Sequence, residues 1–249
     1  MGTPTSPLRL LNCVRPDAAR LAGQPIYQAE GRQGTHTDLR KFCPPVYNQG
    51  NLGACTGFAS AKGFLPTIRN IRGLTTPEMS ALYVYYYERL AERTVNSDAG
   101  ATLCDAMYVL RKRGCATEMA DPYVPASFTV APTPAAEREA PQYAVRLPSR
   151  LVTHEDRLHC LSTGRPFIGG IECFRSLLGP MAARTGIVEL PGWREQPQGG
   201  HAVCFVGFTT DGHFIVRNSW GADWGDQGYF YLPFAYVERH GFDFWTAEA

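Results

Sequence analysis

The sequence predicts an α+β fold, with a helical N-terminal lobe, an antiparallel β-barrel-like C-terminal lobe and a cleft between them. Apolar residues recur at helical spacing between about residues 41 and 125. From about residue 143 the pattern changes to short apolar or alternating runs, separated by turn signals such as Asp211-Gly212. Residues 126–145 show little periodicity and are expected to cross between the lobes. With 249 residues, of which 44% are hydrophobic, the chain can bury a sizeable core.

Three helices are predicted in the first part, over residues 54–66, 77–93 and 103–113. Gly50 and Gly53 give the tight loop that precedes the first of them. We expect Pro66 to end or kink that helix, because a proline removes a backbone hydrogen bond and clashes with the preceding turn. Pro77 suits the first turn of the second helix, and Gly114 stops the third.

Five strands are predicted in the second part, over residues 166–172, 186–190, 202–208, 214–218 and 229–232. Residues 1–40 are rich in proline, glycine and polar residues, so they are expected to form an extended N-terminal extension. Residues 41–249 would then form one domain, with the helical lobe at about 41–125 and the β lobe at about 143–249. The extension joins the domain a few residues before Gln49, so we expect it to cover the cleft. Composition leaves a disordered tail as the alternative.

Four residues of the domain supply the parts of a nucleophilic site. Cys55 stands at the start of a predicted helix, whose N-terminal end favours a thiolate. His201 opens an apolar strand and Asn218 ends the next one, and a thiol needs both a base and a group that orients the base. Gln49 lies six residues before Cys55 and supplies an amide that can donate to an oxyanion. Taken singly, these residues read more plainly as core and loop residues, and their combination is what indicates chemistry.

The order of these four residues resembles the papain-like cysteine peptidases, and in particular their bacterial members. The most specific match is the run Asn218-Ser219-Trp220-Gly221, and the likeness extends over about residues 41–247. The resemblance implies a two-lobe fold with the cysteine on the helical lobe and the histidine and asparagine on the strand lobe. It implies peptide-bond hydrolysis through an acyl-enzyme, with a protein or peptide as substrate.

The resemblance also assigns substrate contacts. Gly53 and Gly100 would approach the substrate backbone, Ala202 would lie at a pocket floor, and Trp220 would shield the hydrogen bond between the imidazole and the asparagine. Thr56 departs from the family, which usually has a bulky aromatic residue next to the nucleophile.

Two other functions stay open at this point. One is acyl or amide transfer by the same cysteine and histidine, although enzymes of that kind pair them with aspartate more often than with asparagine. The other is a catalytically silent binding module on the same fold, which would need none of the four groups. Labelling of the thiol by an epoxide would separate an enzyme from a binder.

Composition limits the partners. A net charge of +1 gives no indication of binding to nucleic acid or to a membrane. No apolar run reaches the roughly 18 residues of a membrane span, and the N-terminus has no apolar block of a secretory signal. We therefore expect a monomer without cofactor or metal, either cytoplasmic or exported without a recognisable signal peptide. Eight cysteines leave an odd number once Cys55 is set aside, so mostly free thiols are expected.

Overall fold

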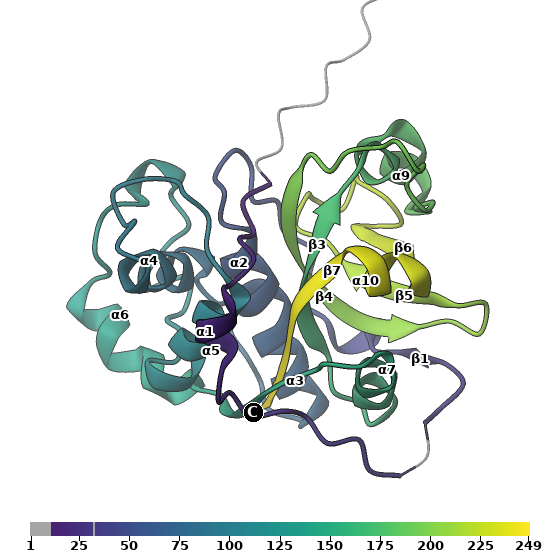
Figure 1. Cartoon of the computed structure of the whole chain (residues 1–249). Helices are drawn as coiled ribbons and strands as arrows, with labels where there is room; N and C mark the ends of the chain where they lie inside the picture. The colour runs from purple at the N-terminus through teal and green to yellow at the C-terminus, as the bar shows by residue number, and fades with distance from the viewer. Residues whose placement is uncertain (1–10, 32) are drawn as a thin grey trace, which may run out of the picture.

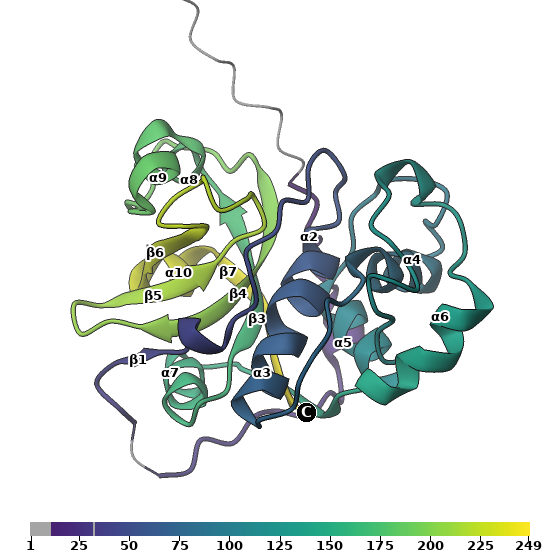
Figure 2. The ribbon, with the colours of Figure 1, turned by 180° about the vertical axis from the view of Figure 1, so that it is seen from behind.

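The computed structural model describes residues 11–31 and 33–249. Helices gather on one side of the molecule and a curved antiparallel sheet on the other, with α2 and α3 between them (Figures 1 and 2). This arrangement confirms the predicted α+β class. The helical part contains α2 (Cys55–Gly57), a π-helical segment (Phe58–Phe64), α3 (Leu65–Ile71), α4 (Ala81–Ala91), α5 (Leu103–Lys112) and α6 (Pro134–Glu139). Short 3-10 turns lie at Arg40–Phe42, Pro125–Ser127 and Ala140–Tyr143.

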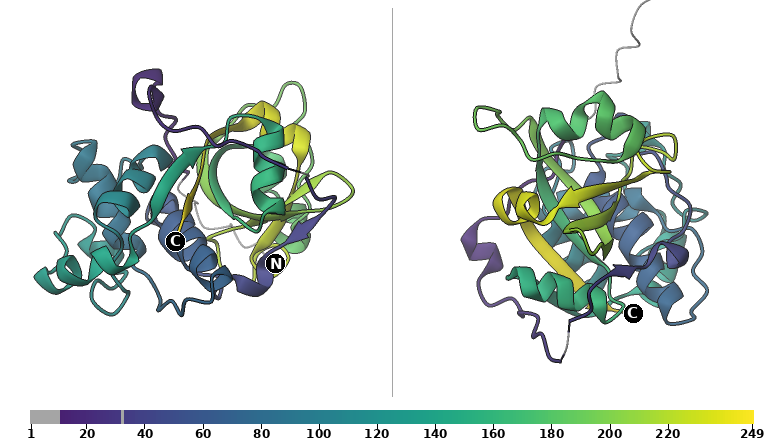
Figure 3. Two further views of the ribbon diagram at one scale, coloured as in Figure 1. Left: turned by 90° about the horizontal axis from the view of Figure 1, so that it is seen from below. Right: turned by 90° about the vertical axis from the view of Figure 1, so that its right-hand side faces the viewer.

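A seven-stranded antiparallel sheet forms the second part, in the order β2-β7-β3-β4-β5-β6 with β1 paired to β4. Its strands are β1 (Thr37–Asp38), β2 (Arg146–Arg150), β3 (Phe167–Cys173), β4 (Gly199–Phe208), β5 (His213–Arg217), β6 (Tyr229–Pro233) and β7 (Gly241–Glu248). The remaining helices are α1 (Ala18–Leu21), α7 (His154–Ser162), α8 (Arg175–Leu178), α9 (Pro180–Thr185) and α10 (Phe234–His240). The sheet curls round (Figure 3), but it is an open sheet that ends at β2 and β6.

The helices begin where the sequence supplies caps. The Ser80 side chain accepts from the backbone N–H of Tyr83 at the start of α4, and Thr102 accepts from that of Asp105 at the start of α5. Such caps satisfy backbone donors that have no partner inside the helix. They also place the starts of these helices: α4 begins four residues later than the predicted 77, and α5 begins at the predicted 103. None of the helices within the described residues is long and apolar enough to cross a membrane.

The prediction that Pro66 ends the first helix is wrong, whereas a kink at Pro66 stays a prediction. The helix continues to Ile71 because the turns before the proline are widened, and Leu65 N–H bonds to Ser60 O, five residues back. Pro66 has no N–H and supplies no helical donor to the preceding turn. Arg217 of β5 donates to the Lys62 carbonyl of that turn, at 3.4 Å. The turn before the proline is therefore also held by a contact with the sheet.

One further prediction differs from the structure. Residues 186–190 form no strand, and only Ile187 bridges Tyr231. Residues 126–145 lead from the helical part to β2, and they contain α6, which starts with Pro134 in its first turn behind a Thr133 cap. All eight cysteines lie in the described part of the chain and are free thiols.

The N-terminal extension passes between the helices and the sheet. In Figure 1 its purple part runs down the front of the molecule to α1 and then crosses beneath the sheet to β1. It is held along the way by the bridge of Ile26 to Arg150 and by the hydroxyl of Tyr27, 3.0 Å from His159 Nδ1. This route takes it past the start of α2.

Candidate active site

Cys55 is the first residue of α2 and is fully buried. Its thiol receives backbone N–H groups from Ala202, from Asn12 of the extension and from Thr56, and these lower its pKa. Burial has the larger effect and raises the pKa of Cys55 to about 11. Burial therefore outweighs the contacts that favour a thiolate in this structure, and the effect of the helix end on the thiol stays a prediction.

His201 and Asn218 meet because β4 and β5 are antiparallel neighbours, with Cys204 paired to Arg217. His201 Nε2 lies 2.8 Å from Asn218 Oδ1. The backbone N–H of Ser219 donates to the same oxygen at 2.9 Å, so this atom is an acceptor and His201 Nε2 is the donor. The asparagine thus fixes both the tautomer and the orientation of the imidazole.

Trp220 covers this pair of residues. Its ring stacks on the imidazole of His201, with centroids 4.6 Å apart and planes at 23°. Trp224 packs edge-on against Trp220 at 4.9 Å and holds it in place. Trp220 is 7% exposed, so the bond between His201 and Asn218 lies behind an aromatic layer, where a hydrogen bond is stronger than in water.

Gln49 is buried and fixed at both ends of its amide. Its Nε2 donates to Leu52 O at 3.0 Å, and its Oε1 accepts from the Ser219 hydroxyl at 2.6 Å. Its backbone N–H donates to Ser219 O at 2.9 Å. These contacts use one of the two amide hydrogens of Gln49, so the other can donate to a ligand. The bonds to Ser219 also join the loop before Cys55 to the loop that carries Asn218.

Gly53 and Gly100 lie against the extension. A Cβ on Gly100, whose φ is +74°, would come within 1.8 Å of Asn12 O, and one on Gly53 within 2.3 Å of Asn12 Nδ2. On the sheet side, Cys13 N–H donates to Gly200 O at 2.9 Å, next to the candidate base. The structure therefore brings the extension into contact with glycines from both halves of the molecule.

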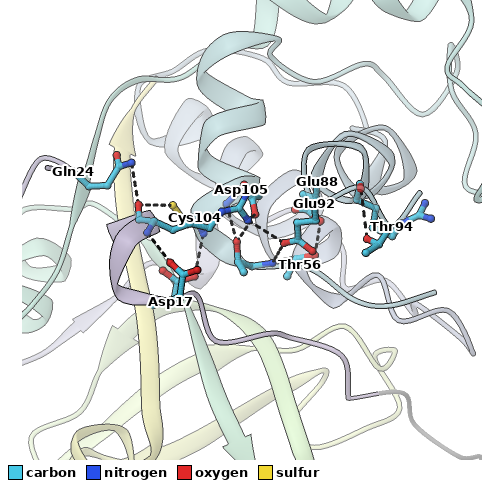
Figure 4. Close-up of polar contacts among 12 residues, drawn as sticks. Asp17, Gln24, Thr56, Glu88, Glu92, Thr94, Cys104 and Asp105 are labelled. Atoms are coloured by element: carbon cyan, nitrogen blue, oxygen red, sulfur yellow. Dashed lines mark hydrogen bonds and ion pairs between the residues drawn. The ribbon is translucent and has the colours of Figure 1, made fainter. Parts of the chain in front are cut away.

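Sequence reasoning missed a buried carboxyl group behind the nucleophile. Thr56 donates its hydroxyl to Glu88 Oε2 at 2.6 Å, and Glu88 is fully buried on α4 (Figure 4). Burial raises the pKa of Glu88 well above its ordinary 4.5, and the nearby Glu92 and Asp105 raise it further, against the opposing effect of the Thr56 bond. The signal was present, because Glu88 falls four residues after the apolar Val84 on the buried face of the helix.

The same polar network reaches the extension. Thr102 joins Glu92 to Asp105, with its N–H 3.0 Å from Glu92 Oε1 and its hydroxyl 2.7 Å from Asp105 Oδ2. Arg20 of α1 pairs with Asp105 and lies 3.7 Å from Glu92. The extension is thus anchored by one cation on two acidic residues.

Arg217 is a second residue that the motifs did not reveal. It is buried and donates to the carbonyls of Pro44, at 2.8 Å, and Pro45, as well as to that of Lys62. It also lies immediately before Asn218. It therefore joins the segment that leads into Gln49 to the strand that precedes the asparagine.

Comparison with known proteins gives a consistent result. Residues 34–239 match the model of the papain family cysteine proteases. An uncharacterised peptidase C1-like protein of Acanthamoeba polyphaga mimivirus is 37% identical over 230 residues, covering 85% of this chain and 73% of that protein. A cathepsin B-like CP3 of Giardia intestinalis is 28% identical over 210 residues, which cover 75% of this chain and 63% of the Giardia protein.

Solved structures agree with the family match. The crystal structure of xylellain, a cysteine protease from Xylella fastidiosa, superposes with a TM-score of 0.87 at 28% identity, covering 100% of this chain and 99% of xylellain. The similar proteins come from a virus, a protist and a bacterium, so the resemblance is not limited to bacterial members of the family. The family match over most of the chain, the viral relative and this superposition together establish that the chain belongs to the papain family of cysteine proteases.

Proposed function

We propose that this cysteine protease hydrolyses peptide bonds with Cys55 as the nucleophile and His201 as its general base. Asn218 orients the imidazole, and the free amide hydrogen of Gln49 stabilises the oxyanion together with the backbone N–H of Cys55. An acyl-enzyme forms on the thiol and is hydrolysed by water. The observation that carries this proposal is the 2.8 Å bond from His201 Nε2 to Asn218 Oδ1, beside a thiol that receives the N–H of Ala202.

An epoxide inhibitor tests the proposal. We expect it to label Cys55 in the full chain, as located by peptide mass mapping, and to abolish hydrolysis of a denatured protein substrate. Cys55→Ala should lose both labelling and activity while keeping its fold. Cys104→Ala removes another buried thiol and is the matched control, so it should keep both. Hydrolysis that persists in Cys55→Ala would refute the assignment, and labelling without hydrolysis would indicate a binding module.

We further propose that residues 1–40 restrain the peptidase domain formed by residues 41–249, with lobes at about 41–125 and 143–249. Asn12 directs its N–H to the Cys55 thiol, whereas its carbonyl accepts from Ala101 N–H at 3.3 Å. A thiolate attacks a carbonyl carbon, so a segment bound in this way blocks the nucleophile without being cut.

Removal of residues 1–16 tests this restraint and leaves α1 and β1 in place. We expect the KM for a small fluorogenic peptide to fall at least several-fold, because the segment no longer competes with substrate. Circular dichroism should show an intact fold. Equal kcat/KM in the full and shortened chains would contradict the restraint.

A further inference from the structure

The extension places one side chain, that of Asn12, in a small polar subsite beside the nucleophile. The backbone N–H of Asn12 reaches the Cys55 thiol, so Asn12 is in direct contact with the nucleophile. Its side-chain Nδ2 lies over Gly53, two residues before Cys55, and donates to Asp98 O at 3.1 Å. The subsite is therefore positioned to receive the substrate residue whose carbonyl is attacked.

The walls of this subsite admit only a short side chain. Gly100 lies against the Asn12 backbone, where an added Cβ would also come within 2.7 Å of Asn12 Cβ. On the Gly53 side, the Cβ position is 2.8 Å from Asp98 Oδ1. Glycine at both positions leaves room for the amide, and Asp98 closes the end of the space.

The polar groups that face the amide are acceptors, because the nearby N–H and O–H donors already have partners. The Asp98 carboxylate receives Gly53 N–H at 3.1 and 3.0 Å and the hydroxyl of Tyr85 at 2.5 Å. The Tyr85 oxygen in turn receives Gly100 N–H at 3.1 Å. The backbone carbonyl of Asp98, with the carboxylate behind it, is thus what the subsite offers to a ligand.

We propose that the subsite formed by Gly53, Asp98 and Gly100 selects asparagine at the substrate residue whose carbonyl Cys55 attacks. The inference rests on the proposed peptidase function and adds a substrate class to it. An asparagine amide donates to the Asp98 carbonyl as Asn12 does. An aspartate has the same shape but brings a negative charge against two acceptors, so it is rejected. Asp98 acts here as the specificity-determining residue.

Four fluorogenic peptides, identical except for Asn, Asp, Ala or Leu at the residue that carries the fluorophore, test the proposal on the full chain. We expect kcat/KM for Asn to exceed that for Asp by at least about 30-fold, and that for Ala by about tenfold, because a site built to hydrogen-bond a side chain discriminates strongly against analogues without the donor. In Asp98→Asn, which keeps the size of the side chain and removes its charge, the ratio of kcat/KM for the Asn peptide to that for the Asp peptide should fall several-fold.

Cleavage of denatured casein and epoxide labelling of Cys55 separate this inference from the function on which it rests. If casein is cut and Cys55 is labelled, but the Asn and Asp peptides are hydrolysed within twofold of each other, the subsite proposal is overturned and the peptidase stands. If casein is not cut and Cys55 is not labelled, both are overturned.

The extension itself gives a second test that needs no asparagine substrate. Asn12→Asp places a carboxylate against Asp98 O and should expel the segment, so KM for the Ala peptide should fall several-fold. Gln142→Glu makes the same change from amide to acid at an exposed position in the turn Ala140–Tyr143 and should leave KM unchanged. Equal kinetics for Asn12→Asp and the wild type would overturn the assignment of the subsite.

Discussion

Replacement of the buried Glu88 by glutamine should change how the stability of the protein depends on pH. The folded pKa of Glu88 is raised above the ordinary 4.5, so above that pH the unfolded chain releases a proton that the folded chain keeps. The native state binds more protons than the unfolded state, and stability therefore falls as pH rises. Glu88→Gln removes this contribution and keeps an oxygen for the Thr56 hydroxyl.

The magnitude follows from linkage. A group that stays protonated in the fold and ionises in the unfolded chain costs about 1.4 kcal/mol for each pH unit. Between pH 5.5 and 6.5, the free energy of unfolding of Glu88→Gln relative to wild type should thus increase by about 1.4 kcal/mol. Glu92 and Asp243, whose pKa values burial raises to about 7 and about 6, produce the same trend in both proteins, so the difference isolates Glu88.

Urea denaturation at the two pH values measures this difference. Glu189→Gln replaces an exposed carboxylate and is the control, with a change that should stay below about 0.5 kcal/mol. The slope between pH values is the informative quantity, because an unpaired amide hydrogen on the new glutamine would shift both points equally. Parallel pH profiles for wild type and Glu88→Gln would refute the neutral, buried carboxyl.

Three more outcomes are expected. Gln49→Ala should lower kcat by roughly 10² to 10³ with KM little changed, as for an oxyanion donor; an equal rise in KM instead would assign Gln49 to substrate binding. Removal of residues 1–16 should lower the raised pKa of Cys55, because water returns to the thiol. Alkylation as a function of pH, with mass mapping of Cys55, measures this pKa. An unchanged profile would argue against desolvation by the extension. Arg217→Met should lower the free energy of unfolding by roughly 3 kcal/mol, since it leaves buried carbonyls unpaired. The control Arg138→Met, at an exposed position, should lower it by less than about 0.5 kcal/mol. Similar losses in both variants would show that Arg217 does not link the helical part to the sheet.

The sequence was most informative where local chemistry decides the structure. α5 begins after Thr102 as its cap requires, and β3, β4, β5 and β6 lie where short apolar runs occur between turns. It failed at Pro66, because the widened turn that accommodates the proline depends on a donor from a distant strand. It also failed over residues 186–190, whose β-branched residues form only a single bridge.

Some of the missed features had a sequence signal. Thr153 and Asp156 form a reciprocal cap at the start of α7, and that spacing is a recognisable helix start. For the candidate site, the motifs indicated which residues to consider, and their roles stay predictions. The contact of Asn12 with Cys55 could not be read from the motifs, because it depends on where a segment without regular structure is held by Arg20 and by Gly200.

The bond between Arg217 and the Lys62 carbonyl links the substitution histories of two positions that are far apart in the chain. Pro66 withholds a backbone donor from the turn that holds this carbonyl, and Arg217 supplies a donor from the sheet. A relative with any other residue at the position of Pro66 regains a backbone donor there, and the bond from the arginine then matters less to that turn. Across an alignment of relatives, proline at the first position and arginine at the second should therefore occur together, and they should be lost together.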